Sequence, residues 1–299
     1  MQEGQVVKAI SGFYYIKDNK GDIYQTRARG VFRKDGINPL VGDYVKFKSD
    51  NLTEGTLMKV KDRKNALVRP PIANVDVGLV VASVREPEFS TQLLDRFLVT
   101  LEHKKIAPII YIAKLDIADQ AEKEKISYYE KVYKKIGYSF IAVNIEKVDN
   151  LKEYLKNRIK NYFTDKLVVF VGQSGAGKST LLNYLDPELN LKTAETSKAL
   201  GRGRHTTRHV ELYPLLDGLF ADTPGYSAMS FLEIEATEIS DCFPEMKKIS
   251  NQCRFRGCLH QNEPNCAVKE AVESKKIEGS RYENYLQILK EVQERKPMY

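Results

Sequence analysis

The chain has 299 residues, of which 42% are hydrophobic and 29% charged, and its formal net charge is +7 at pH 7. The length predicts about two domains. The fractions of hydrophobic and charged residues are those of a globular protein and exclude a largely disordered chain. The sequence contains no run of about 18 apolar residues and no signal-peptide layout at its N-terminus, so we expect a cytoplasmic protein that does not contact membranes.

The positive charge is concentrated near the N-terminus. Residues 1–70 carry 14 basic and eight acidic side chains, whereas residues 231–299 carry 11 basic and 12 acidic ones. A basic surface can serve solubility alone. A small basic module attached to an enzyme instead favours a polyanionic partner, of which nucleic acid is the commonest.

Residues 1–69 are predicted to form a small β-barrel. About five short stretches of alternating apolar and polar residues are separated by Gly, Asn and Asp clusters, a pattern that fits an OB-fold. Basic and aromatic side chains in this region could bind phosphates and stack on bases, although any single aromatic is better explained as barrel core. These residues are Arg27, Arg29, Arg33, Lys34, Tyr14, Tyr15 and Tyr24.

Residues 70–230 are predicted to form an α/β domain with a mostly parallel, doubly wound sheet. The sequence Arg69-Pro70-Pro71 marks its start, because proline cannot donate to a sheet ladder. Nearly continuous apolar stretches then alternate with helical patterns, as expected of strands covered on both faces. The strands are expected at 76–83, 107–113, 139–143 and 167–171, and the helices at 91–103, 120–136 and 148–161. Ligands of such sheets bind beyond the carboxyl ends of the strands.

A phosphate-binding loop follows the strand at 167–171. Residues 172–179, GQSGAGKS, match the pattern G-x-x-x-x-G-K-[ST] and precede the apolar start of a helix. Backbone amides of such a loop surround phosphates, the lysine reaches the outer phosphates, and the hydroxyl binds Mg²⁺. The nucleotide-binding residues expected here are Gly172, Gln173, Ser174, Gly175, Ala176, Gly177, Lys178, Ser179 and Thr180.

Two further segments after this loop complete a nucleotide site. Asp222 begins a D-x-x-G sequence at the end of a short apolar run, where a carboxylate would bind Mg²⁺ through water and the Gly225 amide could sense the γ-phosphate. The basic stretch 201–209 lies between the two motifs. Its Thr207, or else Thr206, could complete the Mg²⁺ shell when a γ-phosphate is present, and its arginines could also contact nucleic acid.

The segment Ala113-Lys114-Leu115-Asp116 resembles the guanine-reading motif N/T-K-x-D. An aspartate there accepts two hydrogen bonds from guanine that adenine cannot donate, and the lysine lies along the base and ribose. Ala113 replaces a polar residue, which removes one possible side-chain contact and should affect nucleotide affinity rather than base choice. Alone, K-x-D would fit an ordinary turn at a strand end. Its position before the phosphate loop is more informative, because it gives the motif order of a circularly permuted GTPase.

With these motifs in this order, the whole chain resembles the circularly permuted ribosome-associated GTPases that act in maturation of the bacterial small ribosomal subunit. The resemblance implies an OB barrel, a permuted GTPase core and a helical zinc-binding domain, here residues 1–69, 70–230 and 231–299. It also implies GTP hydrolysis, Mg²⁺, zinc, and a role as a late assembly factor that contacts ribosomal RNA. Because Tyr226 stands where Ras-like enzymes have a catalytic glutamine, we expect turnover to be slow alone and to be stimulated by the subunit. We expect a monomer that binds GTP and GDP. The sequence departs from the family at Ala113 and at Asn144-Ile145, where a Ser-Ala pair is usual.

The C-terminal region contains four residues suited to one structural zinc ion. The spacing Cys253-x4-Cys258-x-His260-x5-Cys266 supplies three thiolates and one imidazole, which fill a tetrahedral shell and leave no open position. It also matches the zinc motif of the family at all four positions. Free buried cysteines are the alternative, and Cys242 is expected to pack as a small apolar residue.

The residue that orients the attacking water differs from the one in Ras-like enzymes. Tyr226 occupies the position of the glutamine that serves Ras-like enzymes, so another group must do this. His205 is the candidate, and the family resemblance points to it too, although it could instead contact RNA. The expected catalytic residues are His205, Lys178 and Thr207. The alternative functions are a P-loop small-molecule kinase and an RNA-binding module with a vestigial phosphate loop.

Overall fold

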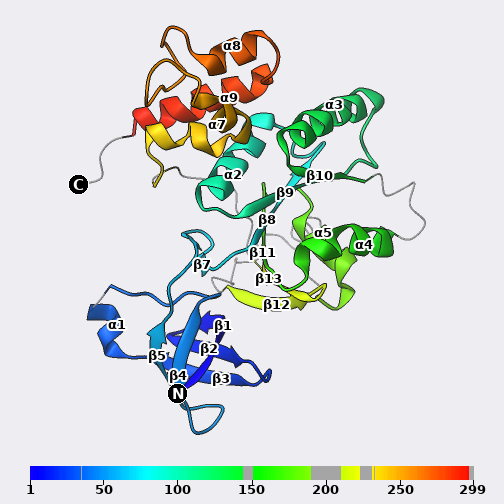
Figure 1. Cartoon of the computed structure of the whole chain (residues 1–299). Coiled ribbons are helices and arrows are strands. Elements are labelled where there is room, and N and C mark those ends of the chain that lie inside the picture. The colour runs from blue at the N-terminus through cyan, green and yellow to red at the C-terminus, as the bar shows by residue number, and fades with distance from the viewer. Residues whose placement is uncertain (35, 144–150, 190–209, 223–230, 232, 296–299) are drawn as a thin grey trace. The chain divides into compact units, whose positions relative to one another are not determined.

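The computed structural model describes residues 1–34, 36–143, 151–189, 210–222, 231 and 233–295 (Figure 1). The chain divides into two compact units. One unit comprises Met1–Gly78, Asp149–Phe170 and Lys178–Tyr226, and the other Leu79–Val148, Val171–Gly177 and Ser227–Tyr299. Among the helices described, none is both long and apolar enough to cross a membrane.

The N-terminal strands of the first unit form a closed barrel, as predicted. The strands follow each other in the order β1-β2-β3-β5-β4, and β1 also pairs with β4, which closes the ring. Strands β3 and β5 are parallel, whereas the other pairs are antiparallel. This arrangement is that of an OB-type barrel. Its elements are β1 (Gln2–Ile10), β2 (Phe13–Asp18), β3 (Ile23–Ala28), helix α1 (Gly30–Lys34), β4 (Tyr44–Lys48) and β5 (Gly55–Val60).

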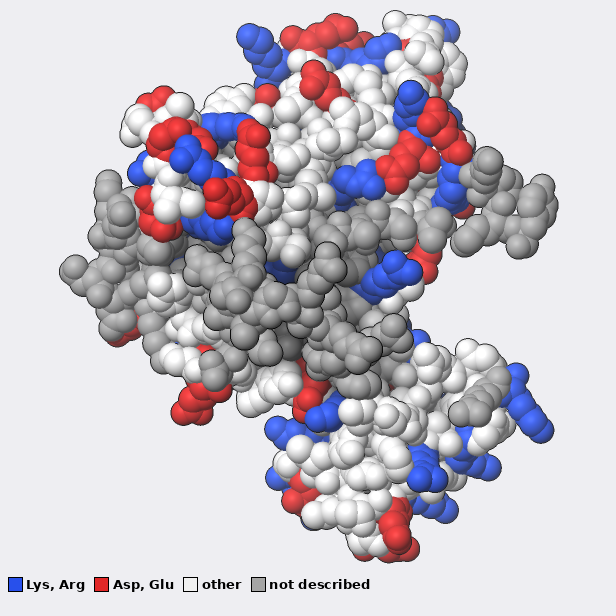
Figure 2. All heavy atoms as spheres, turned by 180° about the vertical axis from the view of Figure 1, so that it is seen from behind, with Lys and Arg blue, Asp and Glu red and all other residues white. Residues whose placement is uncertain are grey.

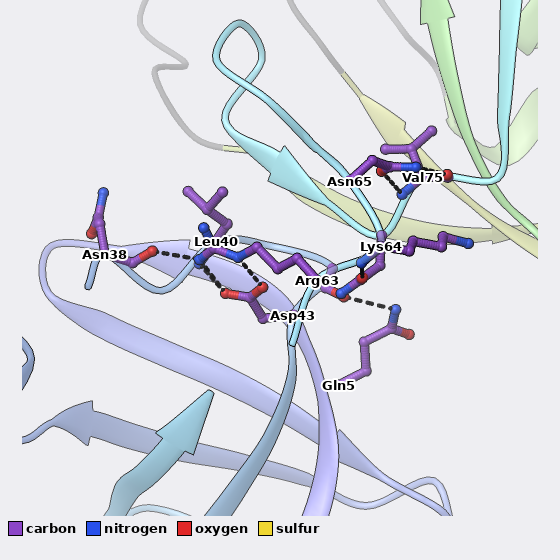
Figure 3. Close-up of polar contacts among 10 residues, drawn as sticks. Gln5, Asn38, Leu40, Asp43, Arg63, Lys64, Asn65 and Val75 are labelled. Atoms are coloured by element: carbon purple, nitrogen blue, oxygen red, sulfur yellow. Dashed lines mark hydrogen bonds and ion pairs between the residues drawn. The ribbon is translucent and has the colours of Figure 1, made fainter. Parts of the chain in front are cut away.

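Polar contacts fix the segment that leaves the barrel (Figure 3). Asp43 is fully buried and accepts hydrogen bonds from Arg63 Nε at 2.7 Å, Arg63 Nη2 at 2.8 Å and the Leu40 amide at 2.7 Å. Asn65 then pairs twice with the backbone of Val75, at 2.8 and 2.9 Å. Because a bidentate pair to a buried carboxylate is strongly directional, this connection is held in one conformation. Two short strands, β6 (Ala66–Leu67) and β7 (Ile72–Ala73), flank the predicted boundary.

The rest of the first unit contains part of the α/β domain. Strand β11 runs parallel to β13, and β13 forms an antiparallel hairpin with β12 that the sequence analysis did not predict. Phe163 of α4 and Phe220 of β13 both pack against Phe170 of β11. The elements are α4 (Leu151–Phe163), β11 (Leu167–Val171), α5 (Lys178–Leu185), the 3-10 turn η2 (Pro187–Leu189), β12 (Glu211–Leu215) and β13 (Gly218–Asp222).

The second unit combines the other predicted strands with the C-terminal helices. Strand β9 lies between β8 and β10 and is parallel to β10. The apolar patterns at these strands are buried, as expected. The bounds are β8 (Val77–Ser83), which begins in the first unit, α2 (Thr91–His103), β9 (Ala107–Ala113), α3 (Gln120–Ile136), β10 (Ser139–Ala142), η3 (Ala236–Glu238), η4 (Ser240–Cys242), α7 (Pro244–Ser250), α8 (Ala267–Glu273) and α9 (Gly279–Gln293).

A buried charge cluster joins α9 to α2. Arg281 is 1% exposed and donates to Asp95 Oδ1 at 2.5 Å and to Glu245 Oε1 at 2.7 Å. Asp95 also accepts from the Tyr133 hydroxyl at 2.7 Å and from Asn284 Nδ2 at 2.6 Å. Burial opposes the charge of the guanidinium, but the two carboxylates hold the pKa of Arg281 above its usual value. The C-terminal helices therefore share one core with the strands and helices that follow residue 78.

Candidate nucleotide-binding and metal sites

The phosphate loop has the strand–loop–helix setting that its sequence predicts. Strand β11 ends at Val171 and helix α5 begins at Lys178. At Gly172 φ is +141°, and a Cβ built on this residue would lie 2.1 Å from the Val81 carbonyl oxygen. No side chain fits there, so Gly172 lets the loop backbone lie directly against strand β8.

The structure brings the phosphate loop and the predicted base-reading segment together. A Cβ built on Gly177, where φ is +102°, would lie 3.2 Å from the Ala113 Cβ. Ala113 is buried at the end of β9, and Lys114, Leu115 and Asp116 follow it directly. The departure from N/T-K-x-D therefore places a small side chain where two backbones approach closely.

Lys178 and Ser179 open helix α5, at the end where helix dipole and free amides favour an anion. Lys178 is half-buried, and burial lowers its pKa to about 8. A phosphate beside the ammonium would raise this pKa again, because an opposite charge favours the protonated form. Thr180 is exposed on the same first turn.

The predicted Mg²⁺ and water-positioning residues are described only in part. Asp222 is the last residue of β13, and Val169 of β11 pairs with Ala221. Because the two strands are parallel, the backbone of Asp222 ends at the same sheet edge as the strand that leads into the phosphate loop. His205, Thr207 and Gly225 lie outside the described residues, together with Thr206 and Tyr226.

The four predicted zinc ligands meet at one point. Their ligand atoms all lie within 4.8 Å of one another. The Cys266 Sγ is 3.8 Å from the Sγ atoms of Cys253 and Cys258 and 3.3 Å from His260 Nδ1. A tetrahedral zinc ion with Zn–S bonds of about 2.3 Å separates its sulfur ligands by about 3.8 Å, so the donor set and the spacing both fit zinc.

Local contacts hold the loop that carries these ligands. The Glu263 carboxylate accepts hydrogen bonds from the amides of Leu259, Gln261 and Asn262 at 2.7 to 3.1 Å. Burial and the neighbouring thiol raise the pKa of Cys258 to about 12. A zinc ion would reverse this shift because it binds the thiolate.

Two exposed surfaces combine basic and aromatic side chains. On the barrel, the Arg27 guanidinium lies 4.5 Å from the centre of the Phe13 ring, and Figure 2 shows Lys and Arg side chains spread over this lower body. On the zinc loop, the ring of Phe255 is 46% exposed and lies between Arg254 and Arg256, which are exposed too. The sequence analysis missed this second surface, although an R-F-R sequence between two ligands is a readable signal. Tyr14, Tyr15 and Tyr24 are half-buried, which fits the core interpretation for them.

Comparisons with known proteins agree with this arrangement. A family model described as RsgA GTPase matches residues 60–232, and one described as RsgA N-terminal domain matches residues 3–57. The small ribosomal subunit biogenesis GTPase RsgA of Enterococcus faecalis is 54% identical, over 99% of this chain and 97% of its own length. A protein of Listeria innocua with the same description, RsgA 2, is 53% identical over both full lengths.

Two solved structures resemble the whole chain. One is the crystal structure of YloQ, a circularly permuted GTPase, with a TM-score of 0.82 and 44% identity, covering 100% of this chain and 97% of that one. The other is YjeQ from Thermotoga maritima, with a TM-score of 0.83 and 32% identity, covering 99% of each chain. The likeness therefore extends through the barrel, the nucleotide site and the zinc segment.

Proposed function

The chain belongs to the RsgA family of GTPases and is a GTP hydrolase, and from this premise we propose that it acts in the biogenesis of the small ribosomal subunit. The relatives from Enterococcus faecalis and Listeria innocua are named for that process. Family membership excludes the small-molecule kinase. The observation that carries the proposal is the packing of Gly177 against Ala113, since it joins a phosphate loop to a base-reading segment that precedes it in the chain.

We propose the following roles in the nucleotide site. The backbone of Gly172–Thr180 and the Lys178 ammonium bind the phosphates, while Lys114 lies along the base and Asp116 selects guanine. Ser179 binds Mg²⁺ directly, Asp222 binds it through water, and Thr207 joins the shell when GTP is bound. The Mg²⁺ ion would neutralise charge that develops on the phosphates.

We also propose that His205 orients the attacking water, because Tyr226 cannot. Its position between Arg204 and Thr206 supports this, since the following threonines are the candidates for closing on Mg²⁺. In the variant His205→Ala, GTP affinity should persist while turnover with saturating subunits falls by about 10². Full turnover at saturation would instead assign His205 to RNA contact.

The partner is small-subunit ribosomal RNA, contacted by the barrel and the zinc loop. Exposed arginines beside aromatic rings on both surfaces support this, because such pairs bind phosphates and stack on unpaired bases. We propose a cytoplasmic monomer with three parts, residues 1–69, 70–230 and 231–299. The family models match residues 3–57 and 60–232, which supports a division near residue 230 and another one some residues before 69.

One experiment tests the base and the partner together. Hydrolysis of GTP, ATP and xanthosine triphosphate is measured with and without small ribosomal subunits, for the natural chain and for Asp116→Asn. We expect GTP to be preferred and subunits to accelerate turnover. Asp116→Asn should favour xanthosine triphosphate, because an amide can donate where the carboxylate only accepted. Unchanged GTP use in the variant would remove Asp116 from the site.

A further inference from the structure

The loop after strand β8 contacts the base-reading segment at two points and the start of helix α3, which follows that segment, at a third. Consecutive residues make these contacts, and each uses a different group. The Val84 amide donates to the Ala113 carbonyl at 3.2 Å, and the Glu86 carbonyl accepts from Lys114 Nζ at 2.6 Å. Between them, Arg85 reaches the start of helix α3, immediately beyond Asp116.

The Arg85 contacts are the most directional of the three. Its Nε donates to Glu122 Oε1 at 3.0 Å, and its Nη2 lies 2.9 Å from both Glu122 Oε2 and Asp119 Oδ2. Asp119 and Glu122 form the capping box of α3. The guanidinium therefore binds the two residues that determine where this helix begins. The base-reading segment is thereby held at Ala113 and at Lys114, and the helix that follows it is held at its N-terminal end.

This loop is itself fixed and lies beside the phosphate loop. The Ser83 hydroxyl donates to the Pro87 carbonyl at 2.6 Å, and a Cβ built on Gly175 would lie 3.8 Å from Pro87 Cδ. Both Glu86 and Lys114 have positive φ, +55° and +62°. Non-glycine residues seldom adopt this conformation, and it is enriched at functional sites.

We propose that residues 84–87 form a brace that sets the position of Lys114 and Asp116 against the guanine base, with Arg85 as a positioning residue. The brace takes over what a polar side chain at the position of Ala113 does where the motif reads N/T-K-x-D. The inference rests on the proposed base-reading role of Asp116. No residue of the brace needs to touch the nucleotide.

The brace should affect base selection more than catalysis. Asp116 accepts from two donors of guanine, and hydrogen bonds weaken steeply when their angles are poor. Inosine triphosphate lacks the exocyclic amine, so it reports how well that second bond is formed. A loosened segment should therefore lose preference for GTP over inosine triphosphate, while the phosphate loop continues to support turnover.

The test compares two variants of the same loop and helix. Arg85→Met removes the contacts of the brace with Asp119 and Glu122 and leaves the two backbone contacts of Val84 and Glu86 in place. Lys125→Met removes the exposed ion pair between Lys125 of α3 and Glu88, 3.6 Å apart, which does not involve the base-reading segment. For Arg85→Met we expect the KM for GTP to rise about threefold to tenfold, kcat to hold, and the GTP preference over inosine triphosphate to shrink by a similar factor. Lys125→Met should behave like the natural chain.

The outcomes separate the brace from simpler explanations. An unchanged preference in Arg85→Met would overturn the brace, as would an equal loss of affinity for both nucleotides together with a lower melting temperature. If Arg85→Met does not fold, the same three quantities (the KM for GTP, kcat and the preference over inosine triphosphate) are measured for Asp119→Asn. Asparagine keeps the helix cap and removes one carboxylate from Arg85. If the natural chain does not prefer GTP over inosine triphosphate, the proposed base-reading role of Asp116 is wrong. The brace proposal, which rests on that role, is then wrong as well.

Discussion

At the scale of single residues, small side chains let the two nucleotide-binding loops approach each other. Ala113 faces the Gly177 backbone, and Gly172 lies on the Val81 carbonyl, where a Cβ would meet the oxygen at 2.1 Å. A side chain at position 177 would crowd Ala113, because packed interiors tolerate little added volume. In the proposed arrangement, the brace contacts of residues 84–87 substitute for the polar side chain that the N/T-K-x-D pattern has at position 113.

The ionisation of Lys178 should make nucleotide affinity pH-dependent. Burial holds its pKa at about 8 in the free protein, and bound phosphate raises that pKa. Below about pH 7 the lysine is protonated in both states, so affinity is constant. As pH rises through 8, binding must take up a proton and affinity falls, approaching tenfold per pH unit.

Titration of a fluorescent GDP analogue between pH 6.5 and 9 measures this slope. Lys178→Arg provides the control, because arginine stays protonated throughout and should flatten the curve whatever its absolute affinity. A flat curve for the natural chain would mean that the free and bound proteins hold the lysine proton equally well.

At the scale of elements, local sequence patterns predicted most of the fold. Alternation and turn residues predicted the barrel, and continuous apolar runs predicted β8, β9 and β11. The β12–β13 hairpin was missed, because Pro214 interrupts an already short strand pattern. The Asp95–Arg281 contact joins residues 186 positions apart, and no periodicity reveals such a partner. The brace was missed for the same reason, because its contacts depend on how separate loops meet.

The zinc site should be structural and separable from nucleotide binding. We expect one zinc ion per purified chain, and Cys258→Ser should lose it and loosen residues 245–275 while GDP binding stays near normal. Metal analysis and limited proteolysis measure both effects. Cys242→Ala is the matched control, since this cysteine is buried but lies outside the ligand cluster. Freshly purified protein without zinc would contradict the assignment.

The buried charge cluster should contribute far more to stability than an exposed ion pair between the same helices. Arg281→Met leaves Asp95 and Glu245 without their cation and should reduce the free energy of unfolding by about 3–5 kcal/mol. Glu291→Gln removes the exposed partner of Arg96, also between α2 and α9, and should cost about 1 kcal/mol or less. Equal losses in chemical denaturation would show that Arg281 is not the main link.

At the scale of the whole molecule, the protein has two separate basic surfaces, one on the barrel and one on the zinc loop, which the net charge alone does not reveal. The C-terminal region has slightly more acidic than basic residues, yet residues 246–262 contain four basic side chains and no acidic one. The carboxylate of Glu263, which directly follows this segment, accepts hydrogen bonds from three backbone amides of the zinc loop. A polyanion can therefore be bound at both ends of the chain, although the C-terminal region is not basic overall.

Binding to small ribosomal subunits should depend on both surfaces and on the nucleotide. Affinity should fall with salt, because each phosphate contact releases counterions and adds about 0.7–0.9 to the slope of log affinity against log salt. The full-length double variants Arg27→Gln/Arg29→Gln and Arg254→Gln/Arg256→Gln should each lower that slope. Lys290→Gln removes an exposed ion pair with Glu294 and should leave the salt slope unchanged. Binding should be tighter with a non-hydrolysable GTP analogue than with GDP, because in our proposal Thr207 joins the Mg²⁺ shell only when a γ-phosphate is present. Sedimentation with purified subunits measures both effects. Equal binding in the two nucleotide states would reject a GTP-controlled switch, and an unchanged slope in either double variant would remove that surface from the interface.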